Sequence, residues 1–194
     1  MAAVEGQGDR RVLGTPARLA RRLGLGAISG YAAYPAGLLG DWLEEAAPLP
    51  YSNWSTVLIG TLFGTLVLSE FVTATRGRVL RVLALAVAST ITYGLTVWLA
   101  TSGYGPLHLG GAASVIASGL VGAVLVTGAV VALAPLHASA TIWPYGLAAG
   151  VVGGIVFEQA LHVEVGPEAL VVGTGYAAWQ VLVCLAIDRG ASRR

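Results

Sequence analysis

Six long apolar stretches divide this chain of 194 residues, and several of them hold no charged residue. They are residues 23–40, 54–75, 79–100, 110–133, 142–161 and 169–187. Each has roughly 18 to 24 residues, the length of an α-helix that crosses about 30 Å of hydrocarbon. Only 11% of the residues are charged, against about 25% in a typical soluble domain. A lipid bilayer is therefore the expected solvent for most of this chain.

The stretches predict an all-α fold, a polytopic integral membrane protein built as a bundle of six transmembrane helices. Lipid offers no partner for exposed backbone N–H and C=O groups, so a crossing segment must satisfy them within a helix. A β-barrel would need segments of about ten residues with alternating polarity, and the sequence lacks this pattern. We expect a basic cytoplasmic segment at 1–22, a six-helix domain at 23–187 and a cytoplasmic tail at 188–194.

The arginines predict the direction in which the helices cross. With the N-terminus inside and six crossings, every arginine falls on one side of the membrane and five acidic residues fall on the other. The arginines are Arg10, Arg11, Arg18, Arg21, Arg22, Arg76, Arg78, Arg81, Arg189, Arg193 and Arg194. An excess of basic residues marks the cytoplasmic side. We therefore expect both termini in the cytoplasm and short loops between antiparallel neighbours.

All eleven basic residues are arginine, and the absence of lysine excludes several kinds of chemistry. A lysine Schiff base to retinal or pyridoxal phosphate is excluded, as is the usual lysine-containing phosphate-binding loop. The single Cys184 rules out an internal disulfide. We expect no nucleic-acid partner. The all-arginine, alanine- and glycine-rich composition is typical of a GC-rich bacterial genome, which would place this multi-pass chain in the inner (plasma) membrane.

Small residues recur at four-residue spacing within three of the stretches. The stripes are Gly26 with Gly30, Gly60 with Gly64, and Ser114 with Ser118 and Gly122. Such stripes let two helix backbones approach closely. They predict close packing inside the bundle, with association into a homo-oligomer or a larger membrane complex as the alternative. Pro35, in the middle of the first stretch, removes one helix hydrogen bond and should kink that helix.

A carboxylate and an imidazole stand four residues apart near the end of the fifth stretch. At this spacing Glu158 and His162 project from one face of a helix. His108 and Glu164 are expected in loops on the same side of the membrane. Because imidazole and carboxylate are ligands of zinc and similar metals, His108, Glu158 and His162 form a candidate metal site. The alternative is an interfacial carboxylate and histidine that pair with each other or reach water.

Glu70 lies within the second stretch, and a carboxylate inside the membrane is a candidate functional residue. An ion pair with Arg76, Arg78 or Arg81, one or two turns further on, is the alternative. Glu70 and Glu158 occupy equivalent places in the second and fifth stretches, and glycines precede both. Three stretches per half would give the halves opposite orientations. These positions raise the option of a 3+3 inverted repeat, a frequent design among transporters.

The middle of the expected bundle carries polar side chains without charge. Tyr93 lies in the third stretch, and Tyr176, Trp179 and Gln180 lie in the sixth. These side chains can line a path for a neutral solute. They can equally form hydrogen bonds between helices, which contribute about 0.6 kcal/mol each.

These features favour a small channel or transporter for an ion or small solute. The candidate binding residues are Glu70, Tyr93, Glu158, His162 and Gln180. A non-catalytic accessory subunit or assembly factor of a larger membrane complex fits the short loops about equally well. Catalysis has little support, because no histidine is expected at the depth of Ser114 or Ser118 to form a nucleophile–base pair. Whether the protein binds a metal ion or another cofactor is left open.

Overall fold

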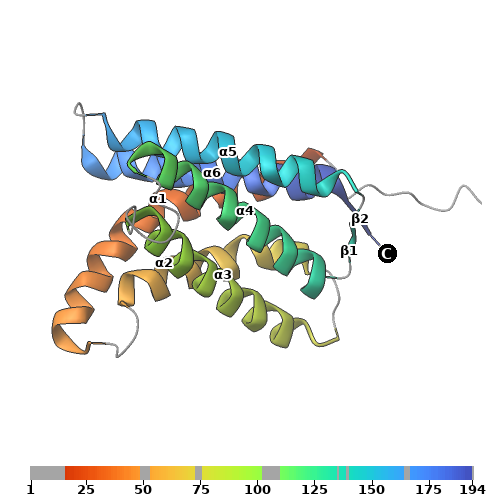
Figure 1. The fold of residues 1–194 in the computed structure, drawn as a ribbon. Coiled ribbons are helices and arrows are strands. Elements are labelled where there is room, and N and C mark those ends of the chain that lie inside the picture. Colours follow the sequence, from red (N-terminus) through yellow and green to blue (C-terminus); the bar gives the residue numbers. More distant parts are fainter. Residues whose placement is uncertain are drawn as a thin grey trace, which may run out of the picture.

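A computed structural model describes residues 16–48, 53–72, 76–101, 110–134, 136–138, 140–163 and 167–193. Within these residues the chain forms six α-helices, one turn of 3₁₀ helix (η1) and two short strands (Figure 1). The elements are α1 (Pro16–Ala46), α2 (Trp54–Leu66), η1 (Leu68–Phe71), α3 (Arg78–Thr101), α4 (Ala112–Leu133), β1 (Leu136–Ala138), α5 (Ile142–Leu161), α6 (Glu168–Gly190) and β2 (Ala191–Arg193).

The helical bundle that the sequence predicts is confirmed. Four segments of the described chain are long and apolar enough to cross a membrane: Trp54–Phe71, Arg78–Thr101, Ala112–Leu133 and Leu170–Gly190. The structure is therefore consistent with a multi-pass membrane protein. Helices α1 and α5 are not among these four, and both contain proline, several glycines and polar residues. Six crossings, and the side that each terminus faces, stay predictions.

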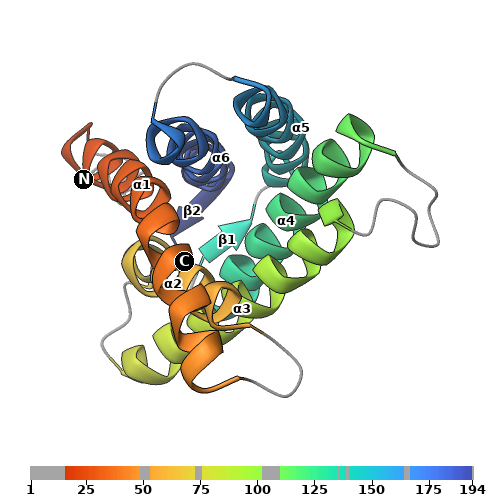
Figure 2. The same cartoon turned by 90° about the vertical axis from the view of Figure 1, so that its left-hand side faces the viewer.

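The six helices form a closed ring. Each helix packs against the helices before and after it in the chain, and α1 also packs against α6. Figure 2 shows the labels α1 to α6 in this order around the bundle. The first and last helices therefore close the ring, and its interior is bounded by elements from the whole described chain.

Contacts at the helix ends show that neighbouring helices run antiparallel. The Arg81 guanidinium, near the start of α3, donates to the Leu133 carbonyl at the end of α4, over 3.0 Å. At the other end of this pair, the Ser114 hydroxyl donates to the Ala100 carbonyl over 3.1 Å. Strand β1 pairs antiparallel with β2 directly after α6. We call the end where α1 and α3 begin and α4 and α6 finish the terminal end, and the other the opposite end.

Helix α1 is longer than the first apolar stretch, because it begins at Pro16 rather than at residue 23. Pro35 lies inside it. Before Pro35, α1 packs on α6, where a Cβ at Gly30 would lie 2.3 Å from the Cα atom of Ala177. After Pro35, it packs on α2, where a Cβ at Gly40 would lie 2.2 Å from the backbone nitrogen of Ser55. Figure 1 shows the later part of α1, in orange, leaving α6 and turning toward α2.

The second apolar stretch is not one continuous α-helix. Helix α2 ends at Leu66, and the chain continues as the 3₁₀ turn η1. At the last turn of α2 the Thr65 hydroxyl donates to the Thr61 carbonyl over 2.7 Å, a bond that competes with the helical ladder. The uniform helix expected over 54–75 is therefore wrong at residues 67–72, and residues 73–75 lie outside the described residues.

The small-residue stripes pack against helices of the same chain. A Cβ at Gly60 of α2 would lie 2.4 Å from the Cα atom of Thr90 in α3, and one at Gly64 would lie 2.5 Å from that of Ala86. Ser114 and Ser118 are buried. The predicted close approach of helix backbones is thus confirmed within the bundle. Association with other chains through these faces stays a prediction.

Candidate functional site

A cavity of about 100 Å³ lies inside the helix ring. Its lining comes from α2, α3, α4, α5 and α6, and most of its surface is apolar. Its aromatic lining residues are Phe63, Tyr93, Phe157, Tyr176 and Trp179, and Gln180 lies among them. Hydroxyl-bearing residues of α3 and α4 complete it. Among the described lining residues none is Asp, Glu, His or Arg, so the interior of the ring is polar at a few points and uncharged.

An aromatic cluster shapes the cavity. The ring centroids of Phe157 and Tyr176 lie 4.7 Å apart in an edge-on arrangement, and those of Phe63 and Trp179 lie 5.8 Å apart. The Trp179 indole N–H donates to the Gly119 carbonyl over 3.0 Å. A Cβ at Gly153 of α5 would lie 2.7 Å from Trp179 Cδ1, so glycine leaves room for the indole. The aromatic rings thereby join α2, α4, α5 and α6.

Tyr93 and Tyr176 meet across the ring, and their hydroxyl groups form a hydrogen bond. Tyr93 comes from α3 and Tyr176 from α6, so the bond joins two helices that are not neighbours in the chain. Each hydroxyl carries one proton and two acceptor lone pairs. One proton is used between the two oxygens, and the second is left for another acceptor.

Gln180 lies one helical turn beyond Tyr176, on the same face of α6. Its side chain lines the cavity, and only 2% of the residue is exposed. The amide oxygen Oε1 accepts no hydrogen bond from any residue that the structure describes. A buried acceptor without a partner costs about 1 to 3 kcal/mol. Gln180 Oε1 is therefore a buried acceptor for which the described part of the chain supplies no partner.

The structure brings two of the five candidate binding residues, Tyr93 and Gln180, to one cavity. The other three lie elsewhere. Glu70 is in η1 near the terminal end, whereas Glu158 and His162 are at the last turn of α5, at the opposite end. None of these three residues lines the cavity. A single site of five residues is therefore not formed, and the binding role of each residue stays a prediction.

Glu70 pairs with a different arginine from those that its position in the sequence suggests. Arg21 Nη2 of α1 lies 2.9 Å from Glu70 Oε1, and no ion pair between Glu70 and Arg76, Arg78 or Arg81 occurs within the described chain. The expected local pairing is wrong, because α1 extends back to Pro16 and places its arginines beside η1.

A buried charge cluster, which sequence reasoning missed, lies beside Glu70. The Arg22 guanidinium pairs with the Asp188 carboxylate, and both residues are almost fully buried. It also donates to the Glu70 carbonyl over 3.2 Å and lies 4.3 Å from the centroid of the Phe71 ring. The available signal was the opposite charge of two residues that directly flank the first and last apolar stretches.

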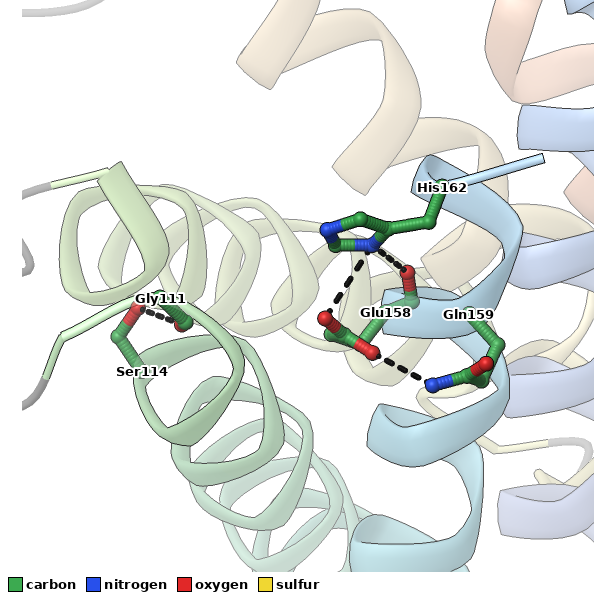
Figure 3. A network of polar contacts seen from close by, with 5 residues as sticks. All are labelled: Gly111, Ser114, Glu158, Gln159 and His162. Atoms are coloured by element: carbon green, nitrogen blue, oxygen red, sulfur yellow. Dashed lines mark hydrogen bonds and ion pairs between the residues drawn. The ribbon is translucent and has the colours of Figure 1, made fainter. Parts of the chain in front are cut away.

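Glu158 and His162 are paired at the opposite end. His162 Nδ1 lies 3.2 Å from Glu158 Oε1 and 2.9 Å from the Glu158 carbonyl oxygen. The Gln159 amide donates to Glu158 Oε2 over 2.9 Å. Figure 3 shows these contacts across from the first turn of α4, where Ser114 binds the Gly111 carbonyl. The four-residue spacing therefore gives the expected contact between carboxylate and imidazole.

A metal site with three ligands is not formed by the described residues. No group of three His, Cys, Asp or Glu side chains converges among them. Glu158 and His162 supply two potential ligands, and His108 and Glu164 lie outside the described residues. The three-residue metal site therefore stays a prediction.

The 3+3 inverted repeat also stays a prediction. Glu70 and Glu158 lie near opposite ends of the ring, as such a repeat requires. Their local structures differ, however, because Glu70 lies in a 3₁₀ turn and Glu158 in a regular α-helix.

Comparisons with known proteins do not assign a role to this site. No protein-family model, curated protein or solved structure matches this chain.

Proposed function

We propose that this protein is a small membrane transporter or channel that carries a small neutral solute through the centre of its helix ring. The cavity is the observation that carries this proposal. It lies within the ring, between the charge cluster at one end and the Glu158–His162 pair at the other. An ion would require charged or closely spaced polar ligands, and the described lining offers two tyrosines, one glutamine and a few hydroxyls.

The distribution of charge supports six crossings with cytoplasmic termini. The described arginines of α1, α3 and α6 gather near the terminal end: Arg18, Arg21, Arg22, Arg78, Arg81 and Arg189. Asp41, Glu44 and Glu45 lie at the far end of α1. This asymmetry is the one that the positive-inside rule describes. In this arrangement α1 and α5 cross beside the four more apolar segments, and the terminal end faces the cytoplasm of a bacterial inner membrane.

The outward surfaces of the ring support lipid as its surroundings. The row Val79, Leu80, Leu83, Val87 and Ile91 of α3 is more than half exposed at every position. An apolar helix face of this size would not be stable in water. Hydrocarbon chains cover it without any further protein.

Flux through proteoliposomes tests the proposal. Purified protein is reconstituted, and the uptake of glycerol, urea and acetamide is followed by stopped-flow light scattering. We expect flux above that of empty liposomes, and a loss of flux in Tyr93→Phe and Gln180→Leu. The matched control is Tyr145→Phe, because Tyr145 is 48% exposed and does not line the cavity.

Two results would contradict the proposal. Unchanged flux in both cavity variants, with lost flux in Glu158→Gln or His162→Ala, would move the solute path to the opposite end. No flux at all, together with a native mass that shows a complex with other proteins, would favour the accessory subunit.

A further inference from the structure

The polar groups of the cavity are not equally satisfied. The Trp179 N–H, the Ser118 hydroxyl and the Thr96 hydroxyl each donate to a backbone carbonyl of the bundle. These three groups are explained by helix packing alone. Gln180 differs. Only 2% of the residue is exposed, and its Oε1 atom has no partner among the described residues. A packing role therefore does not account for this amide.

The tyrosine pair complements Gln180. The Tyr93–Tyr176 hydrogen bond uses one of the two hydroxyl protons. The remaining proton can be donated to a ligand. Gln180 Oε1, one turn along α6, is enclosed in the ligand-free protein, and it can accept a proton from the same ligand once the amide turns toward the cavity. Together with the hydroxyls of Ser89 and Thr92, which also line the cavity, these groups offer hydrogen-bond donors and acceptors with no net charge.

The remaining walls set the size and polarity of the ligand. Phe63, Phe157 and Trp179 present aromatic surface, and the space of about 100 Å³ is sufficient for a small ligand. Apolar walls with a few placed polar groups are typical of sites for small molecules. A charged ligand would lose its hydration without gaining a counter-charge.

We infer that the cavity binds a short neutral amide or alcohol, whose N–H or O–H donates to Gln180 Oε1 and whose oxygen accepts from the Tyr93–Tyr176 pair. The methyl or methylene part of the ligand lies against the aromatic rings. This inference rests on the proposed function, since it names the class of solute that the cavity carries. Binding itself can be measured without any transport.

Acetamide and acetone form a matched pair of probes, because they have nearly the same shape and acetone lacks the N–H donor. Binding to the full chain in detergent micelles is measured by ligand-observed saturation-transfer NMR. We expect acetamide to bind at least about tenfold more tightly than acetone, since acetone leaves Oε1 unpaired. Gln180→Leu should remove this preference, and Tyr145→Phe should keep it.

Several outcomes would overturn the inference: no binding of acetamide, equal binding of the two probes, or an unchanged preference in Gln180→Leu. If Gln180→Leu does not fold, Gln180→Met makes the same test with a flexible side chain of similar length. Selective binding of acetamide without flux would support the inference and contradict the proposed function. Flux of acetamide with no preference over acetone would contradict the inference and leave transport standing.

Discussion

The charge cluster and the cavity are both buried and polar, but their groups are satisfied in opposite ways. In the cluster, Arg22 contacts the Asp188 carboxylate, the Glu70 carbonyl and the Phe71 ring. In the cavity, Gln180 Oε1 has no partner among the described residues. The cluster joins α1, η1 and α6, whereas the cavity lies within the ring between five helices.

This difference separates structural polar groups from candidate binding groups. A buried ion pair whose members are also hydrogen-bonded needs nothing from outside the chain. A buried amide without a partner lowers stability until a ligand supplies the missing hydrogen bond. Charge alone would favour Arg22 and Asp188 as the candidate site. Because their hydrogen-bonding groups are paired and Gln180 Oε1 is not, the uncharged cavity is the stronger candidate.

Removing one member of the ion pair should have the largest effect. Arg22→Leu leaves Asp188 buried without its counter-charge, which should destabilise the protein by about 3 to 5 kcal/mol. Thermal unfolding in detergent, followed by circular dichroism, measures the loss. Arg18→Ala is the control, because Arg18 is exposed on the same helix and should change stability by less than about 0.5 kcal/mol.

The double variant Arg22→Leu with Asp188→Leu should recover much of the loss, because no unpaired charge remains. A double variant as unstable as the sum of the two single variants would show that the cluster is not one paired unit.

The contact that holds α1 against α6 should give the next largest effect. Gly30→Ala places a Cβ within 2.3 Å of the Ala177 backbone, so the two helices must separate, at about 1 to 3 kcal/mol. Gly24→Ala, on the same helix with nothing within 4 Å of the added Cβ, should be neutral or stabilising. Equal unfolding temperatures of the two variants would contradict the close approach of α1 and α6.

The cavity should respond in the opposite direction. Gln180→Leu removes an unpaired buried amide, so the ligand-free protein should become more stable by about 1 to 2 kcal/mol. Added acetamide should raise the unfolding temperature of the wild type and leave that of the variant unchanged. A loss of stability in Gln180→Leu would mean that the amide has a structural role. It would contradict the distinction between a paired cluster and an unpaired cavity.

The exposed ion pair of Arg21 and Glu70, beside the cluster, should matter least. The Arg21 side chain is 68% exposed and that of Glu70 is 20% exposed, so solvent weakens their attraction. Arg21→Ala should cost about 0.2 to 1 kcal/mol, and 0.5 M salt should reduce the difference further. A loss comparable to that of Arg22→Leu would show that the cluster depends on Arg21 as much as on Arg22.

The sequence predicted the helical bundle because lipid leaves the backbone little choice of structure. It also placed Tyr93 and Gln180 at similar depths, since each lies near the middle of its apolar stretch. Their meeting at one cavity depends on the closed ring, which hydropathy does not reveal. The contacts that close the ring join residues far apart in the sequence, such as Arg22 and Asp188, and the pattern of apolar stretches does not reveal such pairs.

The contacts at the terminal end were missed for one reason. A charged residue next to an apolar stretch was interpreted as the point where the chain enters water. That rule placed Arg22 and Asp188 in cytoplasmic segments and gave no reason to expect that the two residues pair with each other within the bundle. It also assigned Glu70 to its neighbours in sequence, because the 3₁₀ turn that directs it toward α1 has no clear sequence signal.

Closure of the ring by α1 and α6 has a consequence for biosynthesis. Arg22 and Asp188 are 166 positions apart, so a ribosome makes the cation long before its counter-ion. Until α6 is complete, the guanidinium has no counter-charge from Asp188. The pair can form only after α6 has been made, so a chain truncated before Asp188 would leave Arg22 without its counter-charge.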